Sequence, residues 1–232
     1  MENKHEKFII IFYVLSLFSM PLTINLMLNN VIKFDYAIRF FILIALCVII
    51  YITSIKIVKY GYDKKILKIN LIIYFLVYII MIFNLTLFDE LYGRQGLTAV
   101  NWNIKLLKEY FNNSLNFIPF HTIKLYINGY NNGIVSYHTF FENIFGNLLA
   151  FMPFAFFIPL IFKKINNYRK FILIMIIIIL QIELLQFITM SGACDIDDAI
   201  LNLFGVSIAY MIFREKHIYR FLNKIFLLEE VK

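Results

Sequence analysis

Long apolar stretches alternate with short polar ones along most of the chain. Because about 20 predominantly apolar residues form a helix that crosses roughly 30 Å of hydrocarbon, each stretch is a candidate transmembrane helix. The spans predicted in this way cover residues 8–28, 36–58, 69–88, 143–162, 171–190 and 199–213. No linker, internal repeat or low-complexity tract separates them. The pattern predicts an all-α, polytopic transmembrane helical bundle of about six spans, folded as one membrane domain over residues 1–232.

Basic residues gather in alternate loops. The chain is 61% hydrophobic and carries a net charge of +7, and the position of that charge matters more than its sum. The basic groups are Lys4 and Lys7; Lys59, Lys64, Lys65 and Lys68; Lys163, Lys164, Arg169 and Lys170; and Arg214, Lys216, Arg220 and Lys224. By the positive-inside rule both termini are cytoplasmic, and residues 214–232 form a basic amphipathic cytoplasmic tail. The charge therefore indicates a membrane surface and no nucleic-acid partner.

The long segment between the third and fourth spans, residues 89–142, is predicted to face outward and to lie at the membrane interface. Its first part, NWNIKLLKEYFNN, is typical of a short surface helix. Apolar aromatic residues then flank Pro119, whose ring disfavours a helical conformation in the residue before it. Such a segment lies in the interface or re-enters the membrane, where non-helical backbone must be covered by protein or line a watery cavity. A polar cavity near the outer face is therefore expected.

Carboxylate and carboxamide side chains lie at or near the outer ends of the fourth, fifth and sixth predicted spans. Glu183 lies about 10 Å from the end of the fifth span at a helical rise of 1.5 Å per residue, with Gln186 on the same face. Asn147 belongs to the fourth span, and Asp198 and Asn202 lie one above the other at the start of the sixth. A carboxylate at that depth costs on the order of 3 kcal/mol and normally faces a bundle interior or a cavity. We therefore expect these groups to meet.

Three aspartates, Asp195, Asp197 and Asp198, precede the sixth span in the stretch GACDIDDAILNLFG. A carboxylate at a helix start is favoured by capping and by the helix dipole, which accounts for one of the three. Two explanations of the rest remain open: a buried network that fixes helix order, or the same network also receiving a polar ligand. Arg94 is the expected counter-ion of Glu183 or the aspartates, since a guanidinium binds carboxylate or phosphate in bidentate fashion.

The sequence contains no motif for a cofactor. HExxH, GxSxG and the P-loop are absent, and an EF-hand starting at Asp195 is excluded because Ile200 and Val206 stand where it needs Gly and Glu. We expect no cofactor and no dedicated metal site, although a water-rich divalent-cation site shared by Asp195, Asp198 and Glu183 remains possible. The cysteine within the acidic stretch is not expected to be a nucleophile, because neighbouring carboxylates disfavour its thiolate.

Five motifs follow one another in order: LYGR, NFIPF, NLLAFMPFAFFIP, IELLQF and DIDDAILNLFG. From about residue 70 to residue 213 the chain thereby resembles the VanZ-like family, named for a protein associated with teicoplanin resistance in Gram-positive bacteria. The family's characteristic polar residues fall on Arg94, Asn116, Asn147, Glu183, Gln186, Asp195, Asp198 and Asn202. The resemblance implies a multi-pass protein of the bacterial cytoplasmic membrane and cell envelope, linked to tolerance of teicoplanin and other lipoglycopeptides.

Two functions remain open from the sequence. In the first, the outer polar pocket uses the eight family residues to bind membrane lipid or a lipid-linked or anionic wall component. In the second, the protein is an intramembrane enzyme acting on a lipid-linked phosphate or sugar, with Glu183, Asp195 and Asp198 as candidate acids and bases. A transporter is disfavoured, because the polar residues are confined to one side of the bilayer and no inverted repeat is present. The sequence indicates no oligomeric state.

Overall fold

The computed structural model describes residues 2–28, 36–88, 104–165 and 167–226. Six segments among these residues are helical, long enough and apolar enough to cross a membrane. They cover Lys4–Met27, Phe41–Lys59, Lys65–Leu87, Tyr137–Ile161, Tyr168–Ile188 and Ile196–Arg214. The all-α transmembrane architecture and the number of spans predicted from the sequence are confirmed.

The chain divides into two compact units, which are described separately. Unit 1 comprises Met1–Tyr78 and Leu222–Lys232, and unit 2 comprises Ile79–Phe221. Unit 2 contains nearly all of the segment over which the sequence resembles the VanZ-like family. The single membrane domain expected from the sequence stays a prediction.

Unit 1 is built from three helices of transmembrane length. These are α1 (Glu2–Leu28), α2 (Tyr36–Lys59) and the first part of α3 (Lys65–Leu87). Tyrosine hydroxyls link the helices of this unit; for example, Tyr13 donates to Asn70 Oδ1 at 2.8 Å and Tyr74 donates to the carbonyl of Cys47 at 2.9 Å. Because hydrocarbon offers no replacement partners, such bonds favour one arrangement of the three helices.

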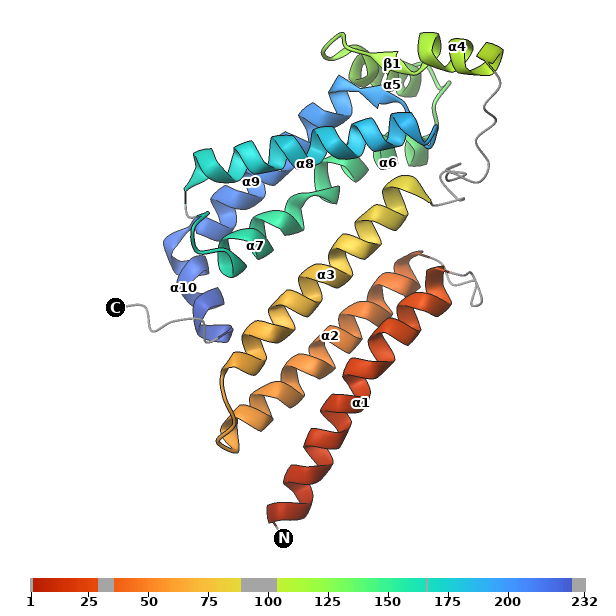
Figure 1. Ribbon diagram of the computed structural model, residues 1–232. Helices are drawn as coiled ribbons and strands as arrows, with labels where there is room; N and C mark the ends of the chain where they lie inside the picture. Colours follow the sequence, from red (N-terminus) through yellow and green to blue (C-terminus); the bar gives the residue numbers. More distant parts are fainter. Residues whose placement is uncertain (1, 29–35, 89–103, 166, 227–232) are drawn as a thin grey trace. The chain divides into compact units, whose positions relative to one another are not determined.

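Unit 2 is centred on its last transmembrane helix. Its long helices are α6 (Tyr137–Ala150), α7 (Met152–Ile161), α8 (Tyr168–Ile188) and α9 (Ile196–Arg214). Helix α9 packs against the other three (Figure 1). Gly205 lies where α9 meets α6, and a Cβ atom there would overlap the carbonyl group of Leu148. The two backbones therefore touch, which only a residue without a side chain permits.

The fourth span differs in detail from the sequence prediction. Instead of one helix over residues 143–162, α6 ends at Ala150 and α7 begins at Met152, with Pro153 in its first turn. Proline has no N–H to donate and its ring collides with the preceding turn, so the hydrogen-bond ladder is interrupted there. The span also begins earlier, because Ser136 caps α6: its Oγ accepts the Thr139 N–H at 3.1 Å.

A smaller layer covers one end of α6, α8 and α9 (Figure 1). It consists of α4 (Ile104–Asn113), β1 (Leu115–Asn116), α5 (His121–Asn131) and β2 (Cys194–Asp195). Helix α4 confirms the predicted surface helix, and α5 has no buried residue, as expected of a segment at an interface. This layer is the part of the protein that closes over the polar ends of the spans.

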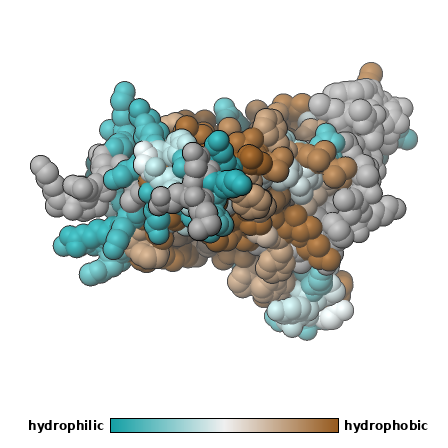
Figure 2. All heavy atoms as spheres, turned by 90° about the horizontal axis from the view of Figure 1, so that it is seen from below, coloured by the Kyte–Doolittle hydropathy of each residue, from teal (hydrophilic) through white to brown (hydrophobic). Residues whose placement is uncertain are grey.

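The exposed faces of the spans are apolar. On α8, for example, Leu173, Ile177 and Leu184 are each more than half exposed and follow one another at helical spacing. Figure 2 shows apolar residues, in brown, over much of the surface in that view. A water-exposed surface of this kind would favour association, whereas acyl chains cover it without cost. The exposed surface therefore agrees with a multi-pass membrane protein.

Candidate functional site

Two short strands tie the outer segment to the start of α9. Strands β1 and β2 pair in parallel, with Leu115 opposite Cys194 and Asn116 opposite Asp195. The Cys194 N–H donates to the carbonyl of Ser114 at 2.8 Å, which extends the pairing by one residue. Residues almost 80 positions apart in the sequence are thereby brought side by side.

Asp195 is the N-cap of α9 and the centre of a hydrogen-bond cluster. Its Oδ1 accepts the Asp197 N–H at 2.9 Å and the Asn116 side-chain amide at 2.9 Å. Its Oδ2 accepts the Thr122 hydroxyl at 2.5 Å. Both carboxylate oxygens are therefore engaged, and the group is only 6% exposed. In this arrangement Asp195 positions the outer segment on the start of α9.

Asp197 caps a helix other than its own. Its two carboxylate oxygens accept the backbone N–H groups of Phe120 at 2.5 Å and Ile123 at 3.1 Å, at the start of α5. Phe120 has a left-handed conformation (φ 64°), and α5 has no side-chain cap from its own N-cap residue. A carboxylate at this position satisfies orphan donors and is favoured by the helix dipole. Asp197 is fully buried, so it belongs to the fold and not to an open site.

Asp198, the third aspartate, faces a cavity. Its Oδ1 accepts the Asn147 side-chain amide at 2.6 Å, and the same amide also donates to the carbonyl of Asn143 at 3.1 Å. The cavity has a volume of about 160 Å³, enough for several waters or a small polar group. It is lined by Leu85, Thr86, Glu142, Asn143, Gly146, Asn147, Ala150, Gln186 and Asp198. Four helices, α3, α6, α8 and α9, thus contribute to one polar cavity.

Gln186 and Glu183 come from α8. Gln186 is buried and donates from Nε2 to the carbonyl of Thr86 at 3.1 Å, which fixes its side chain at the cavity wall. Glu183, one turn earlier, is 5% exposed and does not line the cavity. It lies close to Cys194: burial raises the pKa of that thiol, and the charges of Glu183 and Asp195 raise it further. The sequence prediction that this cysteine is a poor nucleophile agrees with that direction.

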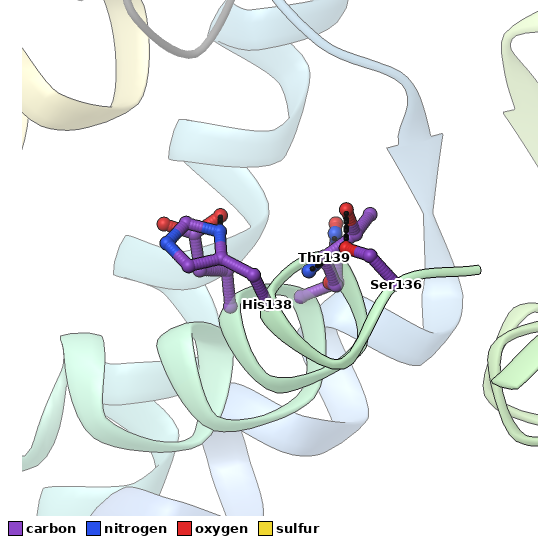
Figure 3. Close-up of polar contacts among 5 residues, drawn as sticks. Ser136, His138 and Thr139 are labelled. Atoms are coloured by element: carbon purple, nitrogen blue, oxygen red, sulfur yellow. Dashed lines mark hydrogen bonds and ion pairs between the residues drawn. The ribbon is translucent and has the colours of Figure 1, made fainter.

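Glu142 is a cavity residue that the sequence analysis missed. It lies on α6, and its Oε2 is 2.9 Å from Nδ1 of His138, which stands one turn earlier at the helix start beside Ser136 and Thr139 (Figure 3). The sequence could have indicated Glu142, because it lies four residues before Gly146 and therefore on the face of α6 that lines the cavity. The cavity thereby contains two carboxylates.

Tyr126 of α5 is a second residue that sequence reasoning missed. Burial raises the pKa of its phenol, and the nearby charges of Asp198 and Asp195 raise it further. The hydroxyl therefore stays protonated near these carboxylates, where it can serve as a hydrogen-bond donor. A tyrosine in a surface helix carries no sequence mark that distinguishes this role.

The structure brings the predicted residues together in two groups. Asn116 and Asp195 form the cluster at β1 and β2, whereas Asn147, Gln186 and Asp198 line the cavity. Asn202, 2% exposed, lies within the helix interface below Asp198, and its Oδ1 has no hydrogen-bond partner in the described part of the chain. Arg94, predicted to be the counter-ion, lies outside the described residues. The binding and catalytic roles assigned to all these residues stay predictions.

The expectation of no dedicated metal site stays a prediction as well. Over the described ranges, no group of three or more His, Cys, Asp and Glu side chains is placed to hold a metal ion. In particular, both carboxylate oxygens of Asp195 accept hydrogen bonds from protein donors, and Glu183 is not among the residues that line the cavity beside Asp198. A divalent cation at this site would have to be held mainly by water, as Mg²⁺ often is.

Comparison with known protein families identifies the family to which unit 2 belongs. The family described as VanZ/LLP1 matches residues 75–221, which is more than half of the chain and includes the whole of unit 2. No curated protein and no solved structure matches the chain. The matched segment contains the strand pair, the three aspartates and every residue that lines the cavity. The chain therefore belongs to the VanZ/LLP1 family of membrane proteins.

Proposed function

We propose that the cavity beside Asp198 binds the polar head of a lipid-linked or anionic component of the bacterial cell envelope. The observation that carries the proposal is the Asn147–Asp198 pair at 2.6 Å, in a cavity whose other polar side chains come from three helices. Carboxylates and carboxamides are acceptors and donors suited to hydroxyl, amide and amine groups, such as those of a lipid-linked sugar. An anionic group would also need a cation beside it, and the sequence analysis predicts that Arg94 supplies this cation.

The proposed binding site lies on a particular side of the membrane, and binding there affects drug tolerance. The lysine-rich loops support a cytoplasmic-membrane protein with both termini in the cytoplasm and the cavity near the outer face. Lipoglycopeptides act on wall components outside the membrane. A protein that binds such a component near the outer face therefore changes how much of it the drug can bind. Tolerance of teicoplanin is therefore the proposed consequence of binding.

The test replaces Asp198 by asparagine. An asparagine oxygen can still accept the Asn147 amide, so the fold is retained while the charge facing the cavity is removed. We expect the component that co-purifies with the wild-type protein to fall about tenfold or more, since a hydrogen bond to a charged group contributes about 1.5–3 kcal/mol. Extraction of the purified protein and mass spectrometry measure this, together with the teicoplanin susceptibility of the cells.

Glu109→Gln is the matched control, because Glu109 is an exposed carboxylate on α4 and is not among the cavity residues. It should retain the co-purified component and the susceptibility of the wild type. Equal retention by the wild type and by Asp198→Asn would show that the cavity is not the binding site. A change in binding with no change in susceptibility would separate the binding proposal from the proposed link to teicoplanin.

A second candidate function is an intramembrane enzyme acting on a lipid-linked phosphate or sugar. It is favoured by one observation, the presence of Glu142 and Asp198 in the same cavity. General acid–base catalysis needs a proton donor and a proton acceptor within reach of one substrate, and two carboxyl groups that line the same cavity meet that requirement of position. Of the catalytic candidates from the sequence, Asp195 is engaged by protein donors and Glu183 lies outside the cavity lining, which leaves Asp198.

Lipid profiles of cells test the enzyme. If Glu142 and Asp198 perform acid–base chemistry, the Glu142→Gln protein should catalyse the reaction about 10²-fold or more slowly. Cells whose only copy is this variant should then accumulate the substrate and lack its product. Cells with the wild-type protein supply the reference profile. Identical profiles would leave binding as the function of the cavity.

A further inference from the structure

A groove runs between α1 and α2 in unit 1, outside the segment that matches the family. It has a volume of about 280 Å³ and is lined by Phe8, Ile9, Phe12, Ile49, Ile52, Thr53 and Lys56. From Ile49 to Lys56 the lining extends along two turns of α2, or about 10 Å at the usual helical rise. The groove is therefore elongated along the helices, the direction in which acyl chains lie in a bilayer.

The walls of the groove are apolar. On α1, the rings of Phe8 and Phe12 stack with centroids 6.4 Å apart and an interplanar angle of 9°, so this wall presents two parallel aromatic rings. On α2, the hydroxyl of Thr53 is turned to its own backbone, since it donates to the carbonyls of Ile49 at 2.8 Å and Ile50 at 3.0 Å. An occupant of this part needs apolar surface and no hydrogen-bonding groups.

One end of the groove is basic. Lys56 is exposed and makes no ion pair within the described part of the chain. Because Phe8 and Lys56 line the same groove, the start of α1 and the end of α2 lie together, and they carry Lys4, Lys7 and Lys59 as well.

The lysines at this end outnumber the acids, since the start of α1 and the end of α2 carry Lys4, Lys7, Lys56 and Lys59 against Glu2 and Glu6. Glu6 accepts the hydroxyl of Tyr62 at 3.1 Å, and Asp63 lies 3.3 Å from Lys65 at the start of α3. A lysine whose stem lies on apolar surface keeps its ammonium at the level of the lipid headgroups. The groove thus combines an apolar length with a cationic end, which complements an acyl chain followed by a phosphate.

We infer that the α1–α2 groove binds one anionic phospholipid, with an acyl chain along Phe8 and Phe12 and the phosphate at Lys56. A neutral lipid satisfies the apolar walls but not the gathered lysines. This site is independent of the Asp198 cavity, because its residues belong to unit 1 and the cavity belongs to unit 2.

The test is native mass spectrometry of the full chain in detergent with an equimolar mixture of phosphatidylglycerol and phosphatidylcholine of identical acyl chains. We expect the wild type to retain phosphatidylglycerol about fivefold better, the factor that one lysine contributes near an anionic surface. Lys56→Gln should abolish that preference. Lys64→Gln removes a lysine of the same unit outside the groove lining and should leave it unchanged.

A second variant tests the apolar part. Ile52 is about half exposed in the groove, so Ile52→Trp fills the space without disturbing the core, and it should lower retention of both lipids alike. Equal retention of the two lipids by the wild type would overturn the inference, as would a preference that survives Lys56→Gln. A bound mass equal to a second copy of the chain, lost in Ile52→Trp, would assign the groove to self-association instead.

Discussion

Replacement of Gly205 by valine is expected to destabilise unit 2 severely. The Cβ atom of any side chain at this position would overlap the carbonyl group of Leu148, which is backbone and cannot rotate away. The whole of α6 would have to move from α9, although α9 packs on α6, α7 and α8 together. Overpacking of a close-packed core costs about 1–3 kcal/mol even where side chains can adjust, and here the adjustment is a helix displacement, so we expect about 3 kcal/mol or more.

Gly146 provides the matched control, because it is also a glycine inside a helix of unit 2. A Cβ atom there meets nothing within 4 Å. Gly146→Ala should therefore be neutral or should stabilise α6 by up to about 1 kcal/mol, the difference in helix propensity between the two residues. Unfolding in mixed micelles, followed by the tyrosine and tryptophan signal and by thermal denaturation, measures both variants. Similar midpoints for Gly205→Val and Gly146→Ala would show that α6 and α9 are not in backbone contact.

The transmembrane part of this fold could be predicted from the sequence because lipid leaves a strong pattern. A span must be apolar over its whole length, so the runs that end near residues 88 and 188 identify α3 and α8. The same rule makes a polar residue in a span informative, and the stripes that contain Asn147 and Asp198 predicted that these groups would meet, as they do at 2.6 Å. The pairing of Asn116 with Asp195 was not predicted: the family motifs named both residues, but no periodicity connects the two segments.

Other features could not be predicted, for identifiable physical reasons. The helix break at Phe151 could not be predicted because a proline such as Pro153 either kinks a span or is accommodated within it. Packing against the neighbouring helices decides between the two outcomes. The partners of Asp197 are backbone N–H groups, which every residue except proline has. The sequence therefore does not indicate which of them a carboxylate binds. The sequence consequently left open a ligand for all three aspartates, whereas in the structure Asp195 and Asp197 hold the outer layer and Asp198 lines the cavity.

The expected effect of Asp197→Ala follows from that engagement. The substitution removes two hydrogen bonds from backbone N–H groups to a buried carboxylate, each contributing about 1.5–3 kcal/mol, and it leaves the start of α5 uncapped. We expect α5 to lose on the order of 3 kcal/mol of local stability while α6 to α9 stay folded, because the lost contacts concern α5 alone. Hydrogen exchange followed by mass spectrometry should then show faster exchange over residues 118–131 and unchanged exchange in α8.

Asp197→Asn separates the charge from the shape at the same position. It keeps one acceptor oxygen in place but lacks the negative charge that the helix start favours, so its exchange should lie between the wild type and Asp197→Ala. Asp197 does not line the cavity, and the lost contacts concern α5, so Asp197→Asn should leave exchange in α8 unchanged. Unchanged exchange in α5 would mean that the two hydrogen bonds do not hold it, and the outer layer would need another anchor.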